Sequence, residues 1–229
     1  MKKDISIGEI VALDYRAAAV FKEAGIDFCC GGKKSIDETC SEKGINKANL
    51  IEKLEKLEST PNTTTHNFIE WEPGFLCDYI MNTHHKFVLK SLPELVQYTQ
   101  KLSSVHGDRH PELTEVAELF SEINRELLQH LKNEEEVLFP AIREAFKSGS
   151  EEAKNTIVSE ISRLSDEHEF AGGAMDKINV ITGNYKVPAD GCNTYHVTFK
   201  LLEQFEDDLH THVHLENNIL FPKAMKTVN

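Results

Sequence analysis

The chain of 229 residues lacks long apolar runs, has few aromatic residues and carries little positive charge. No stretch approaches the roughly 18 consecutive apolar residues of a membrane-spanning helix, so we expect no membrane protein. The charged start is not followed by an apolar segment, and we therefore expect no export by a signal peptide. With 25 basic and 38 acidic residues the net charge is −13. Nucleic acid and anionic membrane surfaces are therefore not expected as partners.

Cysteine is also scarce, and its pattern excludes a disulfide scaffold. The five cysteines are an odd number without framework spacing, which favours a reducing, cytoplasmic location. What remains is an ordinary soluble composition, with 40% hydrophobic and 28% charged residues. That length and composition allow one or two globular domains with a sizeable core.

Helical periodicity dominates the chain, and no run of alternating polarity predicts a strand. Residues 71–229 are predicted to form an up-down four-helix bundle, because the connections between its long helices are short. The sequence is therefore that of an all-α protein. The four long helices are predicted at about 74–104, 111–147, 151–182 and 191–226.

A small helical module, residues 1–58, is predicted to precede the bundle. The polar run Ser59–His66 lies in the predicted linker 59–70. Ser6 and Glu9 have the spacing of a capping box, which opens the first helix. The module is predicted to hold one helix from Ser6 to Gly25 and two further helical stretches, near Ser35–Glu42 and at Asn46–Leu57.

The strongest signal is a repeated motif. Residues 130–140, HLKNEEEVLFP, return as residues 212–222, HVHLENNILFP. A histidine precedes each copy at nearly the same distance: His85 lies 45 residues before the first copy (130 − 85), and His168 lies 44 before the second (212 − 168). Counted from the loops at 1.5 Å per residue, the four motif histidines reach similar heights in the bundle. Residues i and i+4 share a helix face, so each glutamate lies beside its histidine.

This convergence predicts a metal centre in the bundle core. A single His-x-x-x-Glu is more often an exposed pair, but two copies with spaced upstream histidines favour ligands. Buried, facing glutamates are costly and raise each other's pKa unless cations compensate them. Imidazole and carboxylate without thiolate suit iron, with manganese or zinc as alternatives. The predicted ligands are His85, His130, Glu134, His168, His212 and Glu216.

Several neighbouring residues leave alternatives open. His84 competes with His85 for the inward position, and only one of the two is expected to face the core. His210 and His214 flank His212 at two-residue offsets and are expected to point away from its face. Pro140 and Pro222 either bend their helices or mark helix ends. The Gly-Gly pair at 172–173 either opens a ligand channel or, as we favour, permits close helix packing.

The adjacent pair Cys29 and Cys30 is the second chemical feature. These thiols sit on a Gly-rich turn at the end of a helix, where they are redox active, bind metal or simply fill a structural corner. Residue chemistry does not decide between these roles. Cys40, Cys77 and Cys192 are expected to be ordinary, semi-buried residues.

The segment Asp27-Phe-Cys-Cys-Gly-Gly-Lys33, followed by a hemerythrin-like bundle ending in Leu215-Glu-Asn-Asn-Ile-Leu-Phe-Pro222, resembles the repair-of-iron-centres family of ScdA- and YtfE-like proteins. The resemblance covers almost the whole chain. It implies two non-haem iron ions, bridged by oxo and carboxylate groups, on the six predicted ligands. It also implies a cytoplasmic protein, often a homodimer, that restores iron–sulfur clusters damaged by nitric oxide or peroxide.

Within this resemblance, two functions stay open. The centre could donate iron to damaged iron–sulfur proteins, with Cys29 and Cys30 delivering electrons or contacting the recipient. Alternatively, it could reduce nitric oxide at open iron positions. A gas-sensing module that binds nitric oxide or oxygen is a weaker alternative, because no signalling domain is attached. A repair or iron-donor protein is favoured over a turnover enzyme.

Overall fold

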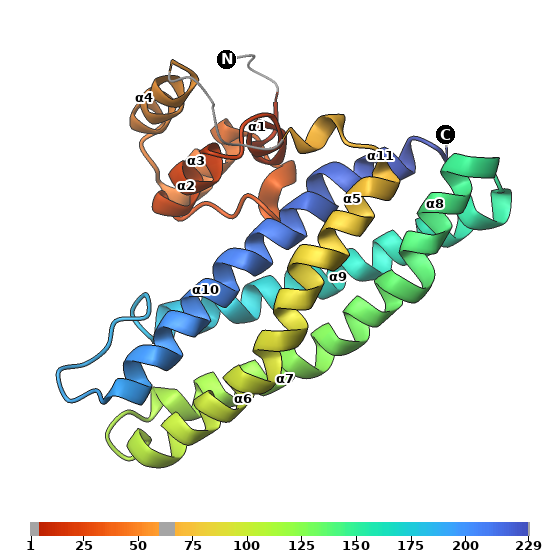
Figure 1. Cartoon of the computed structure of the whole chain (residues 1–229). Coiled ribbons are helices and arrows are strands. Elements are labelled where there is room, and N and C mark those ends of the chain that lie inside the picture. The colour runs from red at the N-terminus through yellow and green to blue at the C-terminus, as the bar shows by residue number, and fades with distance from the viewer. Residues whose placement is uncertain (1–4, 60–66, 229) are drawn as a thin grey trace.

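The structure is a computed structural model that describes residues 5–59 and 67–228, and within these ranges every regular element is helical (Figure 1). The all-α prediction is confirmed. An isolated bridge joins Ser6 to Ser35. No helix of the described part is both long and apolar enough to span a bilayer. The elements of the module are α1 (Ile7–Leu13), α2 (Ala17–Glu23), η1 (Gly31–Lys33), α3 (Ile36–Lys43) and α4 (Lys47–Glu58).

The helix starts of the module follow from local side-chain chemistry. Ser6 forms the predicted capping box: its hydroxyl accepts from the Glu9 N–H at 3.3 Å, and the Glu9 carboxylate accepts the Ser6 N–H at 2.8 Å. At the other end, Gly25 adopts φ +67° just after α2. The prediction of one helix between these points is wrong. Asp14 is extended and accepts the Arg16 N–H at 3.1 Å, and this local bond competes with the helix and divides it into α1 and α2.

The bundle consists of four antiparallel rods, whose ends lie within two residues of those predicted (Figure 1). Three of the rods contain a π turn, in which a backbone hydrogen bond joins two residues that are five positions apart. Helix α6 packs on α7 and α10, and α9 packs on α7 and α8. The rods are α5 (Pro73–Ile80), η3 (Met81–His85) and α6 (Lys86–His106); α7 (Glu112–Asn133), η4 (Glu134–Leu138) and α8 (Phe139–Ser148); α9 (Glu151–Ile181); and α10 (Asn193–Leu215), η5 (Glu216–Leu220) and α11 (Phe221–Met225).

The rods bury two apolar clusters. One, around Phe120 and Phe205, continues into the module, and the other lies around Phe139 and Phe221, where Ala12 of the module packs against it. Phe68, from the short 3-10 turn η2 (Phe68–Glu70), is buried in the second cluster. The end of the predicted linker 59–70 therefore packs on the bundle, whereas most of that linker, residues 60–66, lies outside the described residues.

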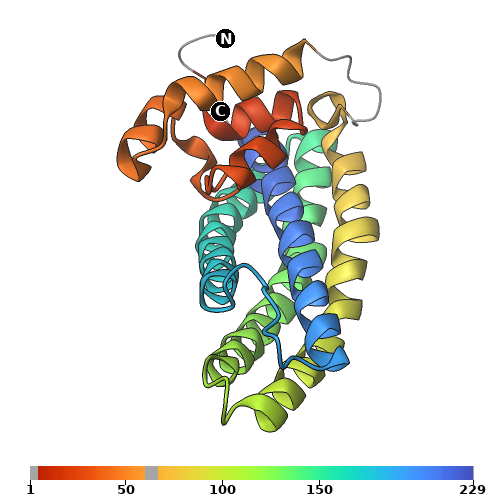
Figure 2. The ribbon, with the colours of Figure 1, turned by 90° about the vertical axis from the view of Figure 1, so that its left-hand side faces the viewer.

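The module sits against one end of the bundle, where α1 contacts α10 and η5 (Figure 2). Tyr15 and Thr211 share a hydrogen bond of 2.6 Å across this junction. Gly8 and Gly32 leave room for Asn218: a Cβ atom on Gly8 would lie 2.0 Å from the amide oxygen of Asn218. The junction thus requires close backbone approach, and glycine supplies it.

Candidate metal centre

Each π turn contains one of the predicted ligands. Glu134 and Glu216 are the first residues of η4 and η5, and His85 is the last of η3. In η4 the N–H of Phe139 donates to the carbonyl of Glu134, five residues back. Pro140 and Pro222 are each the second residue after a π turn and lack an N–H, so each helix continues past its π turn with one donor fewer. The prolines therefore do not mark helix ends. They lie just after π turns, which are wider than α-helical turns and are frequent at functional sites.

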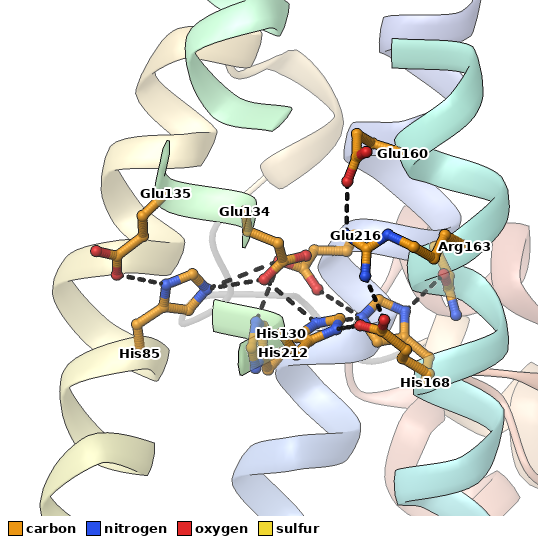
Figure 3. A network of polar contacts seen from close by, with 11 residues as sticks. His85, His130, Glu134, Glu135, Glu160, Arg163, His168, His212 and Glu216 are labelled. Carbon is orange, nitrogen blue, oxygen red and sulfur yellow. Dashed lines mark hydrogen bonds and ion pairs between the residues drawn. The ribbon is translucent and has the colours of Figure 1, made fainter. Parts of the chain in front are cut away.

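The structure brings all six predicted residues together in the core (Figure 3). They form two groups of four, and within each group the candidate donor atoms all lie within 4.8 Å of one another. Each side chain is at most 1% exposed. The first group is His85, Glu134, His212 and Glu216, and the second is His130, Glu134, His168 and Glu216.

Both glutamates belong to both groups, which is the arrangement that two neighbouring cations require. The Nε2 atom of His130 lies 3.3 Å from Glu134 Oε2, and that of His168 lies 3.2 Å from Glu216 Oε2. On the other side, His212 Nε2 lies 3.1 Å from Glu216 Oε1, and His85 Nε2 lies 3.4 Å from Glu134 Oε2. Two pairs of imidazoles therefore flank a shared pair of carboxylates.

Several of these buried atoms have no hydrogen-bond partner among the described residues. They include both carboxylate oxygens of Glu134, Oε2 of Glu216 and Nε2 of His85. A buried carboxylate without partners is strongly unfavourable. The unmet donors and acceptors fit metal ligation, because a cation satisfies all of them at once.

The pKa shifts of His85, His130 and Glu216 also indicate a site for cations. Burial lowers the pKa of His85, but Glu134 and Glu216 outweigh burial and raise that pKa to about 10. Burial and Glu134 act in the same opposed way on His130, whose pKa also rises to about 10. Burial alone would raise the pKa of Glu216, yet the His212 charge and the contact with His168 hold it well below its usual range. Without metal, the carboxylates keep protons on His85 and His130, so positive charge is favoured at this site.

Three further side chains orient the imidazoles, and the motif reasoning did not identify them. Glu135 lies 2.8 Å from Nδ1 of His85, and Glu167 lies 2.8 Å from Nδ1 of His130. Such partners fix the ring so that Nε2 faces the metal position. The signal was present in the chain, because each of the three is the direct neighbour of a ligand in sequence. The third is Asn217, whose Oδ1 lies 3.0 Å from Nδ1 of His168.

The histidines near the centre differ in the direction in which their side chains point. His85 faces the centre, as predicted, but His84 is also buried, at 3% exposure. Only one of the two was expected to face the core; His84 instead lies 2.9 Å from Asp208 and stacks on His212. His214 points away from the centre, packs on Phe28 of the module, and its pKa is lowered by burial to about 4.

The cysteine turn lies directly beside the centre. Cys29 is buried and Cys30 half-buried; their sulfur atoms are 3.9 Å apart and not disulfide-bonded. The Asp27 carboxylate accepts the N–H groups of both cysteines and shapes the turn. The Cys30 thiol donates to the backbone carbonyl of His168 at 3.5 Å, and Asn218 donates to the carbonyl of Cys29 at 3.0 Å. The turn is thus held against backbone that carries metal-site residues.

The structure also places the glycine pair 172–173 and the three remaining cysteines. A Cβ atom on Gly172 would lie 3.4 Å from Cys30 Sγ, an ordinary contact, and one on Gly173 would meet nothing within 4 Å, so these positions do not show the close helix packing that was favoured. Cys40 and Cys77 are buried, whereas Cys192 is exposed rather than semi-buried. Hydrogen bonds from the Tyr195 backbone and His106 lower the pKa of Cys192 to about 7.

Comparison with known proteins agrees with this architecture. A model of the hemerythrin HHE cation-binding domain matches residues 78–224, and the ScdA_N model, a domain of unknown function, matches residues 3–58. The iron–sulfur cluster repair protein ScdA of Staphylococcus epidermidis is 33% identical over 226 residues, covering 97% of this chain and 98% of the relative.

Proteins from other bacteria align equally well. The iron–sulfur cluster repair protein YtfE of Pectobacterium atrosepticum is 32% identical over 227 residues, 98% of each chain. YtfE of Yersinia pseudotuberculosis is 34% identical over 225 residues, 96% of each chain. The chain belongs to the ScdA/YtfE family of iron–sulfur cluster repair proteins. As a member of the ScdA/YtfE family it carries a cation-binding bundle, with which the buried His and Glu groups agree.

Proposed function

We propose that this protein holds two iron ions and repairs iron–sulfur clusters damaged by oxidative or nitrosative stress. His85 and His212 would hold one ion, and His130 and His168 the other. Glu134 and Glu216 would bridge the two. Support comes from the donor set, four imidazoles and two carboxylates without thiolate, which suits iron and resembles centres known in antiparallel bundles. The observation that carries the proposal is that both glutamates belong to both ligand groups.

Iron donation follows from the number and kind of donors. Each ion would receive two imidazoles and the shared carboxylates, which leaves positions for non-protein ligands such as oxo groups, oxygen or nitric oxide. The iron supplies exchangeable coordination when bound. The protein's own contribution is to orient the imidazoles through Glu135, Glu167 and Asn217, and to exclude water by burial.

The recipient is proposed to approach from the side of the cysteine turn. Support comes from Cys30, which is half-buried and bonded to the backbone of His168, so that it links the centre to the module. In this proposal Cys29 and Cys30 deliver electrons or contact the damaged protein. The homodimer and the cytoplasmic location implied by the family resemblance stay predictions.

Metal analysis and a repair assay test the proposal together. We expect about two irons per chain, the stoichiometry of a di-iron carboxylate centre, with an oxo-bridged visible absorption, and reactivation of a nitrosylated iron–sulfur dehydratase. The double variant Cys29→Ala, Cys30→Ala should keep its iron and lose repair, whereas Cys192→Ala, the matched control, should keep both. Full repair by the double variant would remove the cysteines from the proposal. Absence of iron would remove the proposal itself.

Reduction of nitric oxide is separated by a further measurement. Anaerobic addition of nitric oxide to the reduced protein should give stable nitrosyl adducts with loss of iron. Repeated turnover to nitrous oxide would instead show an enzyme.

A further inference from the structure

A second mixed group of potential metal ligands lies outside the centre. Glu206 and His210 stand one turn apart on α10, so they share a helix face, and Asp176 faces them from α9. The donor atoms of these three side chains lie within 4.8 Å of one another. None of the three belongs to the six residues of the central site. The pattern of motif histidines gave His210 no role.

Glu206 is the unusual member, because a carboxylate at 1% exposure needs compensation. The Asn179 amide donates to its Oε2 at 3.0 Å, and the Lys22 ammonium lies 3.7 Å from the same oxygen. Lys22 pairs more closely with Asp207. The hydroxyl of Tyr185 is buried beside Glu206, and burial together with that carboxylate raises the Tyr185 pKa. Burial outweighs the contacts of Glu206 with Asn179 and Lys22 and raises the pKa of Glu206, so its charged form is incompletely compensated.

The group opens into a cavity of about 390 Å³ at the junction of module and bundle. Asp176, Glu206 and His210 line the cavity together with Asp27 and Cys29 of the cysteine turn, and with Lys22 and Lys43. The volume accommodates a cation with water ligands. The cavity therefore joins a preassembled donor set to space for the remaining ligands.

We propose that Asp176, Glu206 and His210 form a third metal-binding site, for a divalent transition-metal ion. Two carboxylates and one imidazole are donors that suit Fe²⁺, Mn²⁺ or Zn²⁺. A bound cation compensates Glu206 and lies beside the cysteine turn. Binding at this site is independent of cluster repair and stands or falls without it.

The test uses the full chain with its central site loaded with iron and excess metal removed. Titration with Mn²⁺ alone, followed by the electron paramagnetic resonance of the free ion, should reveal one further ion per chain. Partners outside the ligand set alone change metal affinity 10- to 100-fold, so Glu206→Gln and His210→Ala should each weaken Mn²⁺ binding at least about tenfold. Glu203→Gln, which removes an acid one turn earlier on the same helix, is the matched control and should bind as the unchanged chain does.

A variant that should tighten Mn²⁺ binding, rather than weaken it, strengthens the test. Lys22→Met removes a positive charge 3.7 Å from Glu206 and should therefore tighten Mn²⁺ binding. Iron content, measured for every variant, reports whether the bundle and its centre are intact. If Glu206→Gln fails to retain iron, His210→Ala and Lys22→Met decide the question. The proposal is overturned if the iron-loaded chain binds no further Mn²⁺, or if these substitutions leave the extra binding unchanged.

Discussion

The two copies of the motif, 130–140 and 212–222, are alike toward the core and different toward the outside. In both, the glutamate opens a π turn and belongs to both ligand groups. The two positions after that glutamate differ: they are Glu135 and Glu136 in the first copy, and Asn217 and Asn218 in the second. The inner glutamates belong to both candidate ligand groups, whereas the outer positions differ with the neighbours of each copy.

The outer contacts explain the difference. Glu135 binds His85, and Glu136 is exposed. In the second copy Asn217 binds His168, while Asn218 turns to the module and donates to the cysteine turn. Helix α1 of the module packs on η5, which belongs to the second copy. A neutral amide there bonds backbone carbonyls that a carboxylate could not serve.

The largest effect should come from the residues that the two copies share. Glu134→Gln and Glu216→Gln each remove one negative charge from both ligand groups, so either variant should lose most of its iron rather than half. Elemental analysis of the purified variants measures this. Glu136→Gln, an exposed acid in the same segment, should keep full iron content. Retention of one tightly bound iron in either ligand variant would contradict shared bridging.

Substitution of the outer partners should have a smaller effect that is similar for the two copies. Glu135→Ala and Asn217→Ala each free an imidazole that the partner orients, and such losses lower metal affinity about 10- to 100-fold. Competition with a chelator measures the affinity. Asn217→Glu places the first copy's side chain in the second, and it should retain binding because a carboxylate also accepts from an imidazole N–H. Unchanged affinity in both alanine variants would show that burial alone orients the rings.

These contacts mark the limit of what the sequence alone could predict. The four rods and the six candidate ligands follow from two periodicities, 3.6 residues per turn and the repeated motif, and both are visible in one chain. The orienting residues are visible only in part: each adjoins a candidate ligand in sequence, but Glu135 stands in a run of three acids and only tertiary contacts select it. Likewise, the helix break at Asp14 depends on a local bond that competes with a favourable apolar face.

The docking of the module could not be predicted for a similar reason. Gly8, Gly32 and Asn218 are far apart in sequence, and their fit depends on how the surfaces of module and bundle meet. The burial of His84 beside His85 was also missed. Its contact with Asp208 on a neighbouring rod is a tertiary one, which helical periodicity cannot reveal.

The next effect in size is expected at Asn218, an outer position at which the two copies differ. Asn218→Ala leaves the carbonyls of Phe28 and Cys29 without their donor, at a cost of about 1–3 kcal/mol. Amide hydrogen exchange should therefore accelerate across residues 27–34 while the bundle stays protected. Glu136→Ala, the equivalent change in the first copy, should alter neither. Equal exchange in the two variants would mean that other contacts hold the turn.

The smallest effect concerns protonation of the metal-free protein. Glu134 and Glu167 surround His130 with negative charge and outweigh its burial, so its pKa is raised to about 10. Burial dominates at His212, where the positive charge of His85 also opposes protonation, and its pKa is lowered. A raised pKa means that His130 stabilises the metal-free fold at low pH and loses this contribution as pH rises from about 6.5 toward 10. Nuclear magnetic resonance of the imidazoles at pH 8 should show His130 protonated and His212 neutral. Identical titration of the two would show that the Glu167 carboxylate beside His130 leaves the core electrostatically symmetric.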